Sequence, residues 1–161
     1  MHLRHFIVIF SIILATFSSY ANEETGSDAE DNYHQGQIFY EDDKFAAAVD
    51  SFSKAISQSP DDSRYHHWLA KTYGELAETS GWLKAMGFAK NAKKSLERAV
   101  ELDPNNVAAL TDLMKYYKEA PGFLGGSARK AEEISNRLEK LNGKNAHSFI
   151  NHHVTSSTQN S

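Results

Sequence analysis

The chain of 161 residues contains no cysteine, only three prolines and no run that alternates convincingly between apolar and polar residues. The lack of cysteine excludes disulfides and thiol nucleophiles, so burial of apolar side chains must hold the fold together. The lack of alternation argues against β-strands. The catalytic patterns H-E-x-x-H and G-x-S-x-G are absent as well. We therefore expect no enzyme activity.

Cofactors, metals and nucleic acids are not expected either. His66 and His67 are adjacent, so on a helix their side chains diverge by about 100° and cannot share one metal ion. His147, His152 and His153 leave a loose zinc or copper site open as an alternative. The formal net charge of −4 gives no support to nucleic-acid binding, which requires a basic surface.

Residues 1–21 have the pattern of a cleaved secretory signal peptide. Arg4 precedes an apolar run over residues 6–17, and Ser19 and Ala21 supply the small residues of a cleavage site. The run is too short for a comfortable membrane span. We expect an exported, periplasmic protein with no membrane span in the mature chain, and a retained N-terminal anchor is the alternative.

Composition divides the rest of the chain into three parts. Residues 22–31 (NEETGSDAED) predict a flexible acidic lead-in, and residues 32–143 carry helical periodicity. Residues 144–161 are rich in Asn, Ser, Thr and His, and they predict a disordered polar tail with at most a short helix around residues 146–153. The helical part suits one domain.

The helical part contains an internal repeat. Apolar residues recur at i, i+3, i+4 and i+7, as in Phe45, Ala48, Val49, Phe52, Ala55 and Ile56, and they predict an all-α fold. The strings FAAAVDSFSKAISQSPDD and AKNAKKSLERAVELDPNN align without a gap, which places Pro60 on Pro104. Each proline ends one predicted helix and precedes polar residues that can cap the next.

This repeat resembles the tetratricopeptide repeat (TPR), a helix–turn–helix unit of about 34 residues with small residues at fixed positions. Residues 29–62, 63–106 and 107–143 follow its pattern, with Gly36 at the small-residue position of the first repeat. The resemblance implies a short α-solenoid of about six helices. An insertion of about ten residues in the middle repeat resembles that of a group of exported bacterial repeat proteins with no defined activity.

The resemblance also implies a concave groove lined by the first helix of each repeat. The positions that it carries onto this chain are Tyr33, Gln37, Tyr40, Arg64, His67, Lys71, Thr111, Lys115 and Lys118. Four cations in one channel suit an acidic peptide or a C-terminal carboxylate, which Lys and Arg can hydrogen-bond. The alternative is that these charges simply coat exposed helix faces.

The insertion carries a concentrated apolar set, Trp82, Leu83, Met86 and Phe88. Local packing is the first expectation for this set, and an aromatic–Met docking surface is the alternative. As a docking surface it would support a homo-oligomer or self-assembling module. As a lid over the groove it would suit a small-ligand carrier that serves a transporter or an envelope enzyme.

The glycine-rich stretch PGFLGGSARK, residues 121–130, suggests a phosphate loop at first sight. Ser127 and Ala128 stand where such a loop requires Lys and Ser or Thr, and a helix rather than a strand precedes it. We expect an elbow between two helices, with Gly122 at positive φ and Ser127 as the next cap. We also expect Phe123 and Leu124 to be buried as a plug.

The sequence as a whole thus predicts a non-catalytic module that binds a peptide or a partner subunit.

Overall fold

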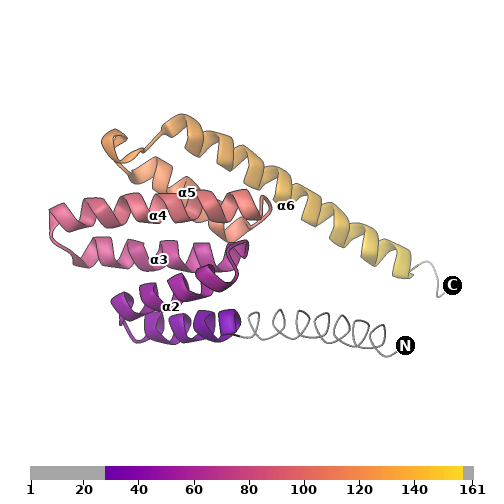
Figure 1. Cartoon of the computed structure of the whole chain (residues 1–161). Coiled ribbons are helices and arrows are strands. Elements are labelled where there is room, and N and C mark those ends of the chain that lie inside the picture. The colour runs from indigo at the N-terminus through magenta and orange to yellow at the C-terminus, as the bar shows by residue number, and fades with distance from the viewer. Residues whose placement is uncertain (1–27, 158–161) are drawn as a thin grey trace, which may run out of the picture.

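The computed structural model describes the backbone of residues 28–157 and the side chains of residues 28–143. The predicted signal peptide and most of the predicted acidic lead-in lie outside these residues. Within the described part every regular element is helical, and successive helices pack side by side in a stack that ends in one long helix (Figure 1).

Six α-helices make up the described part. A first helix covers residues 28–41. It is followed by α2 (Phe45–Gln58), α3 (Ser63–Thr79), α4 (Trp82–Leu102), α5 (Val107–Glu119), a 3₁₀ turn η1 (Gly122–Leu124) and α6 (Ala128–Ser157). Neighbouring helices form three helix–turn–helix pairs, which confirms the prediction of a short all-α solenoid.

The first helices of the second and third repeats, α3 and α5, begin where the sequence supplies a cap. The Asp62 carboxylate accepts a hydrogen bond from the Arg64 amide at 2.9 Å, and the Asn106 side chain accepts one from the Ala109 amide at 3.0 Å. Both satisfy amides that the first helical turn leaves without a partner. The prolines that precede these caps lie outside the helices, as expected from their missing N–H.

Burial is concentrated in two apolar clusters. One joins the first helix, α2 and α3 around Phe52 and Leu69. The other joins α3, α4, α5 and α6 around Leu96 and Leu113. Because α3 contributes to both, the two clusters form one continuous stack.

The small residue of the first repeat permits close contact between two helices. A Cβ atom on Gly36 would lie 2.6 Å from Cε1 of the Phe52 ring, which is fully buried. Only glycine therefore allows the first helix to approach α2 at this distance. The structure agrees with the role that the sequence analysis gave to Gly36.

The elbow after α5 is tightly hydrogen-bonded, but it is not the plug that the sequence predicted. Phe123 is 73% exposed and Leu124 is half-buried. The positive φ, +93°, belongs to Gly125 rather than Gly122. Gly126 lies against the Ala120 carbonyl, where a Cβ would come within 1.7 Å of the oxygen. The 3₁₀ turn η1 directs Phe123 outward, which is why burial of the pair failed as a prediction.

Both ends of the helical region extend past the predicted boundaries. Residues 28–31, assigned to the lead-in, are helical, and Ala29 is buried in the first cluster. At the other end α6 continues to Ser157, where a disordered tail was expected from residue 144. No proline follows Pro121, and a single glycine inside a helix costs only about 1 kcal/mol. The composition therefore did not stop the helix.

No helix in the described part of the chain is both long enough and apolar enough to cross a membrane.

Candidate functional site

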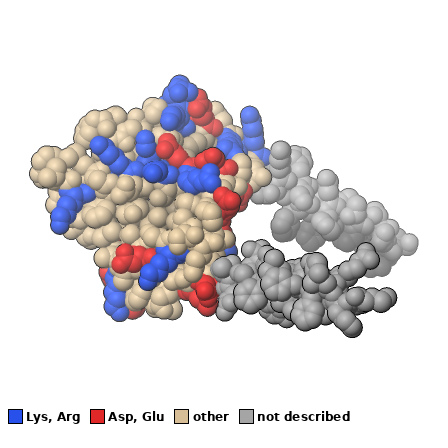
Figure 2. All heavy atoms as spheres, in the orientation of Figure 1, with Lys and Arg blue, Asp and Glu red and all other residues tan. Residues whose placement is uncertain are grey.

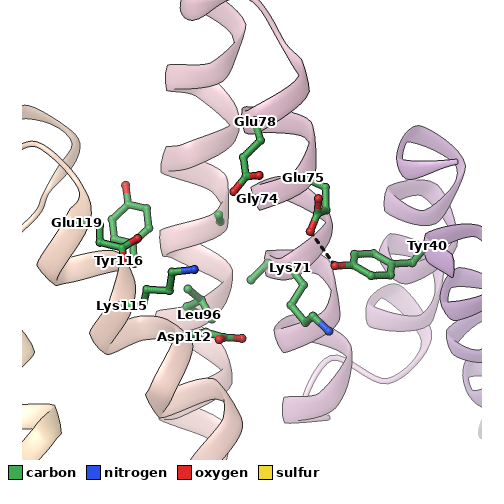
Figure 3. A pocket seen from close by; sticks show the side chains of 12 residues that line it. Tyr40, Lys71, Gly74, Glu75, Glu78, Leu96, Asp112, Lys115, Tyr116 and Glu119 are labelled. Atoms are coloured by element: carbon green, nitrogen blue, oxygen red, sulfur yellow. Dashed lines mark hydrogen bonds between the residues drawn. The ribbon is translucent and has the colours of Figure 1, made fainter. Parts of the chain in front are cut away.

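A cavity of about 360 Å³ opens between the first helix, α3 and α5, with α4 behind it (Figure 3). Its lining residues are Tyr40, Ala70, Lys71, Gly74, Glu75, Glu78, Ala92, Leu96, Asp112, Lys115, Tyr116 and Glu119. Small and apolar side chains form part of this lining, and charged side chains from α3 and α5 form the rest. The opening corresponds to the groove that the repeat pattern implied.

Lys71 and Lys115 bring two positive charges to this cavity. The Lys71 ammonium lies 4.1 Å from the centre of the Trp68 ring and 5.1 Å from that of Tyr40, within the range of a cation–π contact. Lys115 reaches the cavity from α5 (Figure 3) and has no ion-pair partner among the described residues. These two cations are therefore available to a ligand from opposite sides of the groove.

Four carboxylates also line the cavity. Glu75 accepts a hydrogen bond from the Tyr40 hydroxyl at 3.0 Å. Burial, and secondly this bond, raises the pKa of Tyr40 to about 12. Glu78 and Glu119 form no hydrogen bond or ion pair within the part of the chain that the structure describes, although both line the cavity. They leave negative charge available at the end of the groove where α3 and α5 terminate.

The fourth carboxylate ties the two central helices together. Asp112 Oδ2 lies 2.7 Å from Nε2 of His67, a contact that joins α5 to α3. His67 is nearly buried, so this predicted contact residue serves as a link beneath the groove. The Thr111 hydroxyl donates to the Val107 carbonyl of its own helix at 2.8 Å. Lys118 is exposed but does not line the cavity.

At the other end of the groove, most of the residues predicted to contact a ligand instead bind other side chains of the protein. Arg64 binds Glu30 through two hydrogen bonds of 3.0 and 2.8 Å and pairs with Asp62 at 2.7 Å. The Arg64 hydrogen bond holds the pKa of Glu30 below its usual value. Tyr33 is buried, and Gln37 donates to its hydroxyl at 3.1 Å. This end stabilises the first repeat rather than offering free charge.

The charge of the groove therefore differs from the expected basic channel. Lys71 and Lys115 line the cavity as predicted, but four carboxylates surround them. A sequence signal existed, because Glu41, Glu75 and Glu119 each stand twelve residues after the start of their repeats. This position of the second and third repeats, Glu75 and Glu119, lines the cavity, although it lies one residue beyond the positions considered from sequence.

The insertion does not cover the groove. Trp82 and Leu83 are exposed, Met86 is half-buried, and Phe88 stacks on Tyr73 with ring centres 6.1 Å apart. Local packing therefore accounts for Met86 and Phe88 but not for Trp82 and Leu83, and none of the four residues lines the cavity. Among the described residues no group of three His, Asp or Glu side chains is arranged to hold a metal ion.

Comparison with known proteins identifies one repeat by its sequence and the fold of the chain by its structure. The family model described as "Tetratricopeptide repeat" matches residues 63–106, the α3–α4 pair. Among curated protein sequences, none matches this chain significantly.

Solved structures similar to this chain share its fold at low sequence identity. The second TPR of Spaghetti (RPAP3), bound to the HSP90 peptide SRMEEVD, is 18% identical with a TM-score of 0.59, and the match covers 76% of this chain and 98% of that one. MamA is 20% identical with a TM-score of 0.60, covering 76% and 63%. The TPR domain of Arabidopsis OM64 is 20% identical with a TM-score of 0.51, covering 72% and 98%. Residues 63–106 are thus a tetratricopeptide repeat, and the chain has the fold of a tetratricopeptide-repeat protein.

Proposed function

We propose that this chain is a non-catalytic protein-interaction module that binds a peptide segment of a partner protein in its groove. The observation that carries the proposal is the cavity, which gathers two ammonium groups and four carboxylates from two helices, α3 and α5, at one opening. Peptides present charged side chains at regular spacing and also offer backbone donors and acceptors, so such a lining suits them. Two structurally similar domains, the first and second TPR of Spaghetti (RPAP3), are bound to the HSP90 peptide SRMEEVD, which is consistent with this use of the fold.

The distribution of charge favours a peptide of mixed charge over a purely acidic one. A carboxylate of the ligand, from a side chain or a C-terminus, would lie near Lys71 and Lys115. A Lys or Arg of the ligand would lie near Glu78 and Glu119. The last carbonyls of α3 and α5 add partial negative charge at the same end, which favours a cation there.

The alternative of a small-ligand carrier has less support. A carrier of this design requires a lid, and the insertion residues that would form it do not line the cavity. The fold itself is typical of interaction scaffolds, which supports a non-catalytic role.

Export to the periplasm is part of the same proposal. It is supported by the sequence pattern of residues 1–21 alone. N-terminal sequencing of the protein recovered from a periplasmic fraction tests it, and a chain that still begins at Met1 in the cytoplasm would contradict it.

A selection of displayed peptides on the immobilised protein tests the groove. We expect enriched peptides in which an acidic residue is followed or preceded closely by Lys or Arg. The double variant Lys71→Glu/Lys115→Glu should weaken their binding at least tenfold, or about 1.4 kcal/mol. The matched control is Lys54→Glu/Lys140→Glu, which makes the same charge change at exposed positions outside the cavity lining.

Circular dichroism of each variant separates loss of binding from loss of folding. The cation–π contact of Lys71 is worth about 0.5–1 kcal/mol, so the groove variant should remain folded. Failure to enrich any peptide, or equal binding by the groove variant and its control, would rule out the proposed peptide site.

A further inference from the structure

The hairpin formed by α3 and α4 projects from one end of the molecule. α3 has 17 residues and α5, the equivalent helix of the next repeat, has 13. At 1.5 Å per residue the difference amounts to about 6 Å. The turn between α3 and α4 lies at the left of Figure 1, at the same end as the elbow that follows α5. The insertion predicted from sequence therefore lengthens a hairpin and creates a protruding tip.

This end exposes three large apolar side chains. Trp82 and Leu83, the first two residues of α4, are 76% and 67% exposed, and Phe123 on the elbow is 73% exposed. The elbow is held in place, because the Tyr116 hydroxyl donates to the Leu124 carbonyl at 2.9 Å and η1 packs against α4. We name Trp82, Leu83 and Phe123 the apolar tip. None of the three lines the groove cavity.

α4, which carries Trp82 and Leu83 of the apolar tip, is basic over its first four turns. Lys84, Lys90, Lys93 and Lys94 lie on α4 before its first acidic residue, Glu97. The first repeat is acidic by contrast, with Glu41, Asp42 and Asp43 in its turn. Figure 2 shows basic side chains beside the uncharged surface at the left-hand end, and both acidic and basic side chains lower in the view.

Two other acidic residues lie near this end and must be weighed. Glu78 and Glu119 lie at the ends of α3 and α5, and both side chains line the groove cavity. Lys118, exposed at the end of α5, adds a further positive charge. The surface beside the apolar tip thus combines apolar side chains with an excess of lysine.

We infer that the apolar tip docks the protein onto an anionic lipid surface. Trp and Phe side chains partition to the boundary between headgroups and acyl chains, and Leu adds apolar area. Lysine near an anionic leaflet strengthens binding roughly fivefold per residue. A symmetric contact with a second copy is disfavoured, because it would bring the same lysines together.

Vesicle flotation tests this inference on the chain that begins at Asn22, which retains every helix of the described part and omits the apolar run of residues 6–17. The probes are vesicles of phosphatidylcholine with about one third phosphatidylglycerol, and vesicles of phosphatidylcholine alone. We expect binding to the anionic vesicles, at least tenfold weaker binding to the neutral ones, and loss of binding in 0.5 M salt, where charges are screened.

Variants locate the contact. Trp82→Asp should reduce binding at least tenfold, whereas Ile38→Asp, a matched change at a side chain 56% exposed on the acidic first repeat, should leave it unchanged. Trp82→Phe should still bind but lose the blue shift of tryptophan emission that vesicles produce, since Trp68 is packed in the first cluster.

Three results would overturn the inference. They are no flotation with anionic vesicles, equal flotation of the Trp82→Asp and Ile38→Asp variants, and light scattering that shows a Trp82-dependent dimer in place of vesicle binding. The last result would assign the apolar tip to a second copy of the chain.

Discussion

Substitution of Gly36 by alanine tests how the first repeat is packed. A Cβ at this position would lie 2.6, 2.7 and 2.9 Å from Cε1, Cδ1 and Cζ of Phe52. Phe52 is fully buried, with ring centres 6.1 Å from Tyr33 and 6.0 Å from Trp68, so its ring has no free space to move into. The added methyl group must therefore push the first helix away from α2.

The expected loss follows from two opposing terms. Overpacking costs about 1–3 kcal/mol, and a clash with three ring atoms belongs at the upper end of that range. Alanine in a helix interior gains about 1 kcal/mol over glycine. The free energy of unfolding should fall by about 2 kcal/mol, and the Tm by roughly 8 °C at about 4 °C per kcal/mol.

Urea unfolding followed by circular dichroism measures the change, and Gly74→Ala is the matched control. No atom lies within 4 Å of a Cβ at Gly74, which also stands inside a helix, so this substitution should raise stability by up to about 1 kcal/mol. Phe52→Leu in the Gly36→Ala background should recover part of the loss. The packing argument is refuted if Gly36→Ala and Gly74→Ala have the same stability.

Two further predictions follow from the elbow and from the groove. Gly126→Ala places a Cβ 1.7 Å from the Ala120 carbonyl oxygen, so the elbow must open and the 2.8 Å hydrogen bond from the Ser127 amide to the Tyr117 carbonyl should break. Faster hydrogen exchange at the Ser127 amide is the expected result, and unchanged exchange would contradict it. The raised pKa of Tyr40, about 12, favours the neutral phenol in the folded state. Its contribution to stability is complete below the ordinary tyrosine pKa near 10 and is lost as the pH rises from about 10 to 12. Absorbance titration of the wild type against Tyr40→Phe measures this, and a Tyr40 midpoint near 10 would be inconsistent with burial of the Tyr40 hydroxyl and its contact with Glu75.

The fold could be predicted because each local signal pointed to the same architecture. Pro60 and Pro104 end helices at equivalent places, and Asp62 and Asn106 cap the helices that follow. Gly36 marks a close helix contact that the structure contains. Such features act through backbone geometry and neighbouring residues, so they are visible in one sequence.

The candidate site was less predictable, because its charges depend on partners distant in sequence. Arg64 was expected to contact a ligand, yet Glu30 lies 34 residues before it and binds it through two hydrogen bonds. Glu78 and Glu119 were not considered, because they lie near the ends of α3 and α5, beyond the repeat positions assigned to the groove. Phe123 was assigned to the interior, whereas the 3₁₀ turn directs it outward.

The sharing of α3 between the two apolar clusters has a consequence for how the molecule unfolds. Leu69 belongs to the cluster of the first repeat, and Ala70, the next residue, belongs to the cluster of the later repeats. Loss of the first helix and α2 would expose one side of α3 while α4 still covers the other, and the converse holds for loss of α4 and the helices after it. Partial opening can therefore begin at either end, but neither end can melt α3 without the other. We therefore expect α3 to be the last helix to unfold, with the slowest hydrogen exchange at its backbone amides.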